Sequence, residues 1–169
     1  MASDMTTAFT TEHGQVAVFV AIDHCSAECV GLHAARRGTR FEALEPVRQG
    51  VVERFGGVET DAAQGLSLRH DHGSQYMSHD FQTEITWLGA ASSPAFVRAP
   101  EGNGCAERFI RTLKENLLWV RTFRTVEELR LALIDFRHTY NEHWLIERHR
   151  HRSPAQFQRD QMDTLPLAA

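Results

Sequence analysis

The sequence lacks a hydrophobic segment long enough to cross a membrane, because its longest apolar run covers only residues 16–22. It also lacks a basic segment followed by an apolar stretch at its start, so we expect no signal peptide. Three cysteines, an odd number, argue against a disulfide framework and fit a reducing cytoplasm. No internal repeat interrupts the 169 residues, a length that suits one domain with a hydrophobic core.

An excess of positive charge is missing as well. The net charge is −4, which by itself argues against a nucleic-acid partner. Residues 108–152, however, hold 10 of the 18 Lys and Arg but only 6 of the 22 Asp and Glu, so this stretch carries +4 and the remainder −8. A basic stretch beside an acidic remainder is compatible with a DNA-binding face next to a cluster of metal-binding carboxylates.

The first half of the chain predicts strands followed by a helix. Residues 5–10 and 15–22 are β-rich and joined by a turn, and residues 26–33 can form a third strand, so we expect an antiparallel meander. Apolar residues recur at helical spacing over 41–55, and Pro46 fits that helix only in its first turn. Residues 66–70 predict a short strand.

The second half predicts mainly helices. Residues 78–88 have Ser78 as a plausible N-cap, and further helices are expected over 104–120, over 125–142 and briefly after Ser153. Residues 89–104 contain three Gly, two Pro and two Ser, so we predict a loop there, with residues 92–104 mobile in the absence of DNA. Strands first and helices later indicate a mixed α/β domain.

Three carboxylates are candidates for chemistry. Asp71 follows a strand candidate and precedes a glycine by one residue, which fits either a side chain projecting into a cleft or an Asx-type turn. Glu107 lies near the start of a helix that Asn103 can cap, and an exposed salt bridge is its ordinary alternative. Asp4 precedes the first strand, and nothing in its immediate surroundings marks it as catalytic.

The combination of these residues is more specific than any one of them, since 35 residues separate Asp71 from Glu107. The sequence resembles the integrase catalytic core of bacterial insertion-sequence transposases and, more distantly, that of retroviral integrases. The resemblance covers nearly the whole chain, and the segments that carry it are residues 3–6, 18–26, 70–76, 103–113, Tyr140-Asn141 and Ser153-Pro154.

The resemblance implies an α/β fold of the RNase H-like type, in which helices flank a five-stranded mixed sheet. It implies an integrase core over residues 1–155, with a C-terminal tail over 156–169. It further implies that Asp4, Asp71 and Glu107 are the catalytic residues and the metal ligands of a DNA-cleaving and strand-transferring enzyme.

Magnesium or manganese, as two ions, is the cofactor that the resemblance implies. Mg²⁺ prefers oxygen ligands, and two such ions can activate an attacking oxygen and stabilise a leaving one. The implied partners are DNA, as element ends and target, and further copies of the chain, at least a dimer on DNA. The implied location is the bacterial cytoplasm, associated with the nucleoid.

The sequence departs from the family pattern at its start. Met1 stands where the family usually has a bulky aromatic residue, and no helix-turn-helix region precedes the core, so we expect a fragment. Asp23 competes with Asp4 for the first catalytic position, because an Ile-Asp pair ahead of a Ser also recurs in the family. The alternative for Asp23 is a turn carboxylate leading into the third strand.

Two basic residues follow Glu107 on its helix face, Arg111 and Lys114, and we predict that they contact DNA phosphates. Surface charge pairing is the alternative for both. Two further functions stay open for the whole chain. One is a catalytically inactive transposase remnant that serves as a DNA-binding or dimerisation module, and the other is a stand-alone nuclease of the RNase H superfamily.

Overall fold

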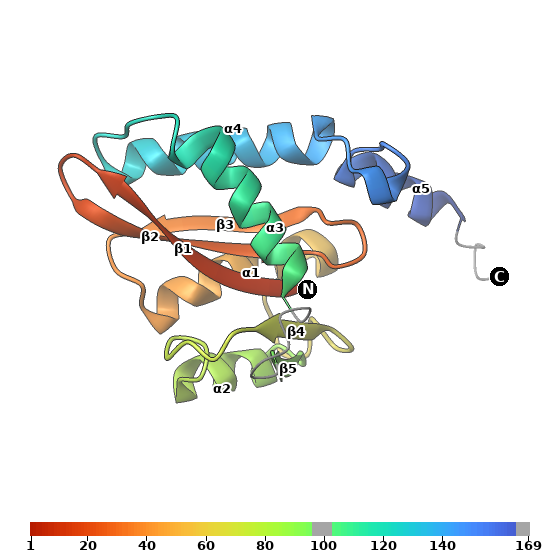
Figure 1. The fold of residues 1–169 in the computed structure, drawn as a ribbon. Helices are drawn as coiled ribbons and strands as arrows, with labels where there is room; N and C mark the ends of the chain where they lie inside the picture. Colours follow the sequence, from red (N-terminus) through yellow and green to blue (C-terminus); the bar gives the residue numbers. More distant parts are fainter. Residues whose placement is uncertain (96–102, 165–169) are drawn as a thin grey trace.

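The computed structural model describes residues 1–95 and 103–164 (Figure 1). Strands β1 (Ala2–Thr10), β2 (Gly14–Ile22) and β3 (Cys29–Ala35) form an antiparallel meander, as predicted. The short strands β4 (Ser67–His70) and β5 (Ala91–Pro94) add to it in parallel, which gives the sheet order β3-β2-β1-β4-β5. The predicted five-stranded mixed sheet is therefore confirmed.

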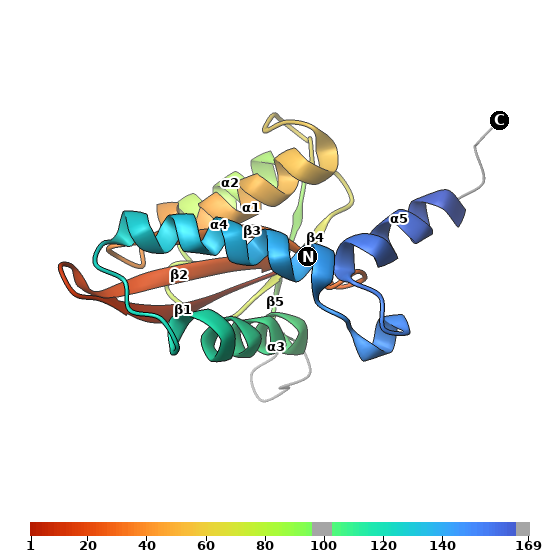
Figure 2. The same ribbon diagram turned by 90° about the horizontal axis from the view of Figure 1, so that it is seen from above.

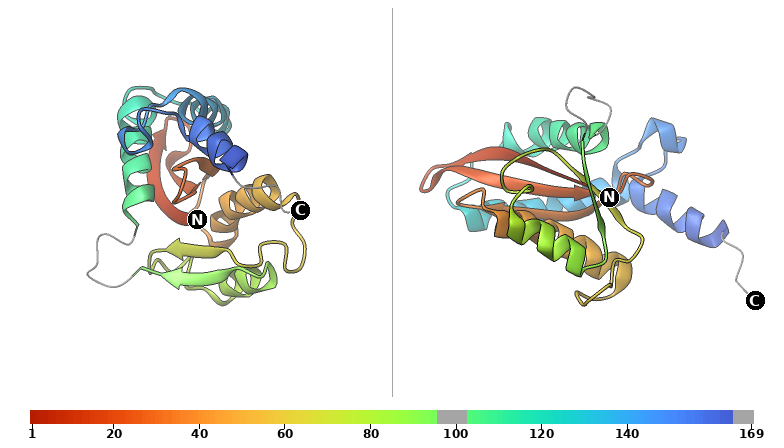
Figure 3. Two further views of the ribbon diagram at one scale, coloured as in Figure 1. Left: turned by 90° about the vertical axis from the view of Figure 1, so that its right-hand side faces the viewer. Right: turned by 90° about the horizontal axis from the view of Figure 1, so that it is seen from below.

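Helices cover both faces of this sheet. Helix α1 (Arg40–Phe55) and helix α2 (His79–Trp87) lie on one side, and helix α3 (Gly104–Leu113) and helix α4 (Val126–His143) lie on the other (Figures 2 and 3). The helix predicted over 104–120 ends in a π-helical turn, η2 (Lys114–Leu118). A single 3₁₀ turn, η3 (Glu147–His149), leads to α5 (Pro154–Thr164), which points away from the sheet. None of the helices in the described part of the chain is long and apolar enough to cross a bilayer.

Strand β2 explains why both faces are covered, because it is apolar at nearly every position. Val16, Val18 and Val20 belong to a buried cluster with α3 and α4, whereas Ala17 and Phe19 belong to a second cluster with α1 and α2. Side chains of a strand alternate between its faces, so an uninterrupted apolar strand needs a helical layer on each side.

Pro46 lies in the second turn of α1, so its predicted place in the first turn is wrong. The helix begins at Arg40 because the Thr39 hydroxyl caps it by accepting a hydrogen bond from the Glu42 amide at 3.4 Å. Pro46 is buried against β3, where Gly31 faces its carbonyl so closely that a Cβ on Gly31 would lie 1.9 Å from the oxygen. Ser78, by contrast, caps α2 as predicted, by accepting from the Phe81 amide at 3.3 Å.

Strand β5 lies inside the segment predicted to be a loop, so that prediction is wrong for residues 91–94. These residues pair with β4 from Ser67↔Ala91 to His70↔Pro94. A strand of only four residues that contains Ser-Ser-Pro carries almost no sequence signal, and it forms because β4 offers it a free edge. The predicted mobility of residues 92–104 falls largely on 96–102, which lie outside the described residues.

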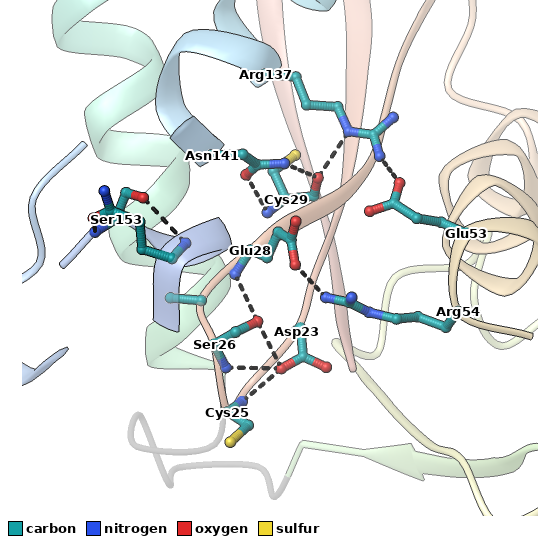
Figure 4. A network of polar contacts seen from close by, with 12 residues as sticks. Asp23, Cys25, Ser26, Glu28, Cys29, Glu53, Arg54, Arg137, Asn141 and Ser153 are labelled. Atoms are coloured by element: carbon teal, nitrogen blue, oxygen red, sulfur yellow. Dashed lines mark hydrogen bonds and ion pairs between the residues drawn. The ribbon is translucent and has the colours of Figure 1, made fainter. Parts of the chain in front are cut away.

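Strand β3 forms one edge of the sheet, and side chains from the helices satisfy its outward backbone groups. Asn141 of α4 accepts from the Cys29 amide at 2.9 Å and donates to the Cys29 carbonyl at 3.0 Å (Figure 4). Arg137 donates to the same carbonyl at 2.7 Å. The Leu32 amide donates to Gln49 of α1, and the Ala34 carbonyl accepts from Arg130 of α4. Asn141, from the Tyr140-Asn141 pair, thus anchors α4 to the sheet edge.

Candidate active site

Two of the predicted catalytic carboxylates come from neighbouring parts of the sheet, Asp4 from within β1 and Asp71 from directly after β4. Ala2 of β1 pairs with Arg69 of β4, and Asp4 and Asp71 each follow two residues later. Residues two apart in a strand share a face, so Asp4 lies on the face of Ala2. Asp71 lies just beyond the end of β4, and its charge acts on Asp4. Ala2 is buried in the cluster that includes α3, so this is the face that α3 covers.

Glu107 comes from the first turn of α3, where its side chain is exposed. The helix packs on β1 and β2 through its buried stripe of Ala106, Phe109, Ile110 and Leu113. This packing brings Glu107 towards the two strand carboxylates, although it is far from both in sequence.

The pKa of Asp4 reflects the charges of the other two carboxylates. Its pKa is raised from 3.8 to about 6, first by burial and also by the charges of Asp71 and Glu107, while the amide of Met5 and the ammonium of Lys114 act in the opposite direction. The three carboxylates and Lys114 therefore share one electrostatic neighbourhood.

The carboxylates do not converge to the spacing of a metal site. Within residues 1–95 and 103–164, no group of three His, Cys, Asp or Glu side chains is close enough to hold an ion. One oxygen of Asp4 accepts from the Met5 amide at 2.7 Å, and one oxygen of Asp71 accepts from the Gly73 amide at 2.8 Å. The latter bond is the Asx-type turn weighed as an alternative for Asp71. The donors nonetheless fit a divalent cation chemically, because they are hard oxygen ligands and one of them is destabilised as an anion.

His70 supports Asp71, and the sequence analysis did not single it out. Burial lowers its pKa, so the ring is neutral at pH 7. Its Nδ1 contacts the Asp71 carbonyl at 2.7 Å and therefore donates, which leaves Nε2 to accept from the Ser92 hydroxyl at 2.9 Å. The ring stacks on Tyr76, whose hydroxyl accepts from Ser3 at 3.4 Å. The available signal was a histidine at the end of a strand, directly before an aspartate.

Asp23, the competitor of Asp4, caps the turn between β2 and β3. One of its oxygens accepts from the amides of Cys25 and Ser26, both at 2.9 Å, and from the Ser26 hydroxyl at 3.1 Å (Figure 4). Burial alone would raise the pKa of Asp23, but the Ser26 hydrogen bonds and the charge of Arg54 bring it below the ordinary value. This is the turn carboxylate weighed as its alternative.

The two predicted DNA contacts differ in their surroundings. Lys114 begins η2, and its charge reaches Asp4. Arg111 is 78% exposed and pairs with Glu115 at 2.8 Å, one turn further on, which is the surface pairing weighed against it. Asn103 occupies the N-cap position of α3, as predicted, but makes no capping hydrogen bond, and its buried Oδ1 has no partner within the described residues.

Comparison with known proteins places this site in a family context. Residues 91–154, which contain β5, α3 and α4, match the model of the Integrase core domain. An InsD protein of insertion element IS2E from Escherichia coli is 29% identical over 111 residues, which cover 65% of this chain and 50% of that protein. The InsD transposase of insertion element IS2H from Escherichia coli is also 29% identical, over 65% of this chain and 36% of its own length. Residues 91–154 are thus similar to an integrase core domain, and the chain is similar to InsD proteins over about two thirds of its length.

Solved structures agree with that assignment at the level of the fold. The catalytic core domain of BIV integrase aligns with a TM-score of 0.62 at 20% identity, covering 96% of both chains. The HTLV-2 integrase catalytic core domain in complex with magnesium aligns with a TM-score of 0.60 at 15% identity, covering 92% of this chain and 94% of that one. The chain thus has the RNase H-like fold that the resemblance implied. The matched region spans half or less of the length of the InsD relatives.

Proposed function

We propose that this integrase-type core cleaves DNA strands and transfers them in a metal-dependent reaction. Asp4, Asp71 and Glu107 are the catalytic carboxylates and the ligands of two Mg²⁺ or Mn²⁺ ions. The observation that carries the proposal is the shared electrostatic neighbourhood of these three side chains, which come from β1, from the end of β4 and from α3.

The chain's own groups have distinct roles in this proposal. Asp4 is held by the central strand of the sheet, where it pairs with Val20 of β2, and β1 pairs with β4 two residues earlier at Ala2. His70 holds the backbone of Asp71 through its Nδ1–H, and Glu107 enters from a helix end next to a segment rich in glycine. Bound divalent ions supply the positive charge that the three carboxylates lack and a Lewis acid for the phosphodiester.

DNA is the proposed substrate, as element ends and as target. Lys114 lies beside the carboxylates and contacts a backbone phosphate near the reacting bond, and Arg111 contacts a phosphate further along the same helix face after leaving Glu115. A homo-oligomer, at least a dimer on DNA, is part of the proposal. It is supported by the HTLV-2 integrase catalytic core domain, whose solved structures include a trimeric and a dimeric form. The proposal also retains the bacterial nucleoid as the location and residues 1–155 as the core, with 156–169 as a tail.

A second candidate function is an inactive module that binds DNA or dimerises. The observation in its favour is that the carboxylates of the described residues are not close enough together to hold an ion. In that case the shared neighbourhood of Asp4, Asp71 and Glu107 is inherited from an active ancestor and performs no chemistry.

The experiment that separates these functions compares wild type with Asp71→Asn and, as a matched control, with Glu59→Gln on the exposed turn after α1. Mn²⁺ binding is measured by calorimetry, and nicking and joining of labelled DNA are measured with Mn²⁺ or Mg²⁺. We expect wild type and Glu59→Gln to bind Mn²⁺ and cut DNA, and Asp71→Asn to lose cutting by at least about a thousandfold, since the ligand set is broken. DNA affinity should stay equal or rise, because one repulsive charge is gone.

Three other outcomes are informative. Equal cutting by Asp71→Asn and wild type would move the active site elsewhere. If wild type neither bound Mn²⁺ nor cut DNA, the second candidate function, the inactive module, would be favoured. Cutting without any joining of strands would favour the stand-alone nuclease.

A further inference from the structure

A second site is indicated by a cavity beside the carboxylates. The cavity has a volume of about 510 Å³, within the range of roughly 300–1,000 Å³ that is usual for small-ligand pockets. It lies between the β2–β3 turn, the first turns of α3 and the segment that follows α4.

The lining of the cavity is strongly positive. Three arginines, Arg69, Arg108 and Arg148, line it, whereas Glu147 is the single carboxylate among its lining residues. His24 also lines it, and burial lowers the pKa of this ring first, followed by the chain's amino terminus and the charges of Arg69 and Arg148. The lowered pKa of His24 thus comes first from burial, and the positive charges around the ring add to it.

Two of these guanidinium groups make no carboxylate pair within the described residues. Arg108 is exposed and has no ion pair there, and Arg148 donates only to the His24 carbonyl at 3.1 Å and to the Cys105 sulfur at 3.9 Å. Most of the other arginines are neutralised by neighbouring carboxylates, for example Arg121, Arg124, Arg130, Arg137 and Arg152. Arg108 and Arg148 thus bring positive charge to this cavity that no carboxylate pair compensates within the described residues.

An aromatic ring completes the chemistry of the lining. Trp144 is 37% exposed, and its ring stacks on buried Tyr140 with centroids 6.2 Å apart and planes 29° apart. Guanidinium groups that contact phosphates and a supported aromatic face on which a base stacks are the two elements of a single-strand binding site.

We propose that this cavity binds one unpaired nucleotide of a DNA strand. Arg108 and Arg148 hold its phosphate, and its base stacks on Trp144. Arg69 adds positive charge at the side of the cavity nearest to the sheet.

The position of the cavity relates it to the proposed active site. Arg108 follows Glu107 directly, and Arg69 of β4 precedes Asp71 by two residues. Arg108 and Thr112, one helical turn apart, both line the cavity, whereas Glu107, Arg111 and Lys114 follow a neighbouring face of the helix. The cavity is therefore distinct from the predicted Lys114 contact. The inference that the cavity binds a nucleotide adjacent to the reacting bond rests on the proposed function.

The test measures binding of fluorescein-labelled DNA of unrelated sequence by anisotropy at low salt, in EDTA so that cleavage is absent. One probe is a blunt duplex, and the other is the same duplex with a short single-stranded overhang. We expect Arg108→Ala and Arg148→Ala each to weaken binding of the overhang probe about tenfold, with a log-log salt slope shallower by about one. Trp144→Ala should weaken overhang binding about tenfold and blunt-duplex binding less than about twofold, because only an unpaired base can stack.

The matched control is Arg37→Ala, which removes an exposed arginine from the opposite end of β3 and should change neither affinity. Because Arg148 also supports the β2–β3 turn, Arg148→Lys is the second variant at that position. It keeps the charge, and it should recover most of the lost affinity if the group binds phosphate. Equal weakening by Arg37→Ala and Arg108→Ala, or equal effects of Trp144→Ala on both probes, would overturn the proposal.

A thiol footprint gives an independent measurement. Cys105 lines the cavity and is partly exposed, so in a Cys25→Ser background its alkylation rate should fall severalfold when the overhang probe is bound. An unchanged rate at saturating probe contradicts binding in the cavity. An acidic peptide that protects Cys105 better than the DNA probe does would also overturn the proposal.

These results are separable from the test of catalysis. If wild type binds the overhang in this manner but never cuts DNA, the proposed nucleotide site stands and the proposed function is rejected. If wild type cuts DNA but Arg108→Ala, Arg148→Ala and Trp144→Ala bind the overhang normally, the proposed function stands and the nucleotide site is rejected.

Discussion

Replacing Asp4 by Asn should stabilise the metal-free protein at neutral pH. The pKa of Asp4 is raised from 3.8 to about 6, which corresponds to about 3 kcal/mol at about 1.4 kcal/mol per unit. Since Asp4 is partly exposed, solvent screening reduces this figure, and we expect about 1–2 kcal/mol. For a chain of this length, that corresponds to a rise in Tm of about 2–8 °C at pH 7.5, measured by thermal unfolding in EDTA.

The pH dependence follows from the direction of the shift. Above about pH 6 the carboxyl is ionised in both states, and the folded state bears the full cost of the buried charge. As the pH falls from about 6 towards 3.8, the folded protein takes up a proton first, so this cost disappears in wild type. The advantage of Asp4→Asn should therefore be present at pH 7.5 and largely gone at pH 4.5.

Asp23→Asn is the matched control, because its shift has the opposite sign. The pKa of Asp23 is lowered, so its ionised form stabilises the folded state at neutral pH, and this contribution is lost as the pH falls through the folded-state pKa. Asp23→Asn should lower Tm at pH 7.5. If Asp4→Asn also lowered Tm there, or left it unchanged, the electrostatic reasoning for Asp4 would be refuted.

Divalent ions should reverse the order of wild type and Asp4→Asn. A ligand that binds only the folded state stabilises it by RT ln(1 + [L]/Kd), so Mg²⁺ or Mn²⁺ should raise the Tm of wild type. The Asn variant lacks one oxyanion ligand and should gain less. An identical gain for both proteins would show that Asp4 is not a ligand, even if the metal-free prediction held.

Three further predictions concern binding and packing. Lys114→Ala should weaken binding to unrelated DNA sequences about equally and make the salt slope shallower by about one, measured by anisotropy over a salt series. Asn141→Ala leaves a buried amide of β3 unpaired and should cost about 1–3 kcal/mol in urea unfolding, whereas Asn116→Ala on the exposed face should cost little. Gly31→Ala forces a backbone shift and should destabilise by at least about 2 kcal/mol, whereas Gly57→Ala, with open space around it, should not.

The candidate site was largely predictable because it depends on local motifs. Asp71 directly follows a strand, Glu107 lies in the first turn of a helix, and the spacing between them matches the family pattern. The side-by-side register of Asp4 and Asp71 was not predictable from either segment alone. It depends on the parallel pairing of β1 with β4, which is set by tertiary packing over more than sixty residues of intervening chain.

Other features escaped prediction for reasons that are physical. Strand β5 has weak β propensity and is formed by the free edge of β4. Pro46 is held in the interior of α1 by packing against Gly31, which a local rule for proline cannot anticipate. Arg111 was expected to reach for phosphate, but without DNA it pairs with Glu115, one turn away, and sequence spacing allows both arrangements equally.

The side chains along the outer edge of β3 have a consequence for the behaviour of the protein in concentrated solution. An edge strand with free amides and carbonyls can recruit a strand from another molecule and so begin aggregation. Here Asn141, Arg137, Arg130 and Gln49 already occupy the outward groups of Cys29, Leu32 and Ala34. The same helices that bury the core thus prevent this edge from extending the sheet into a neighbouring copy, and assembly is left to side-chain surfaces.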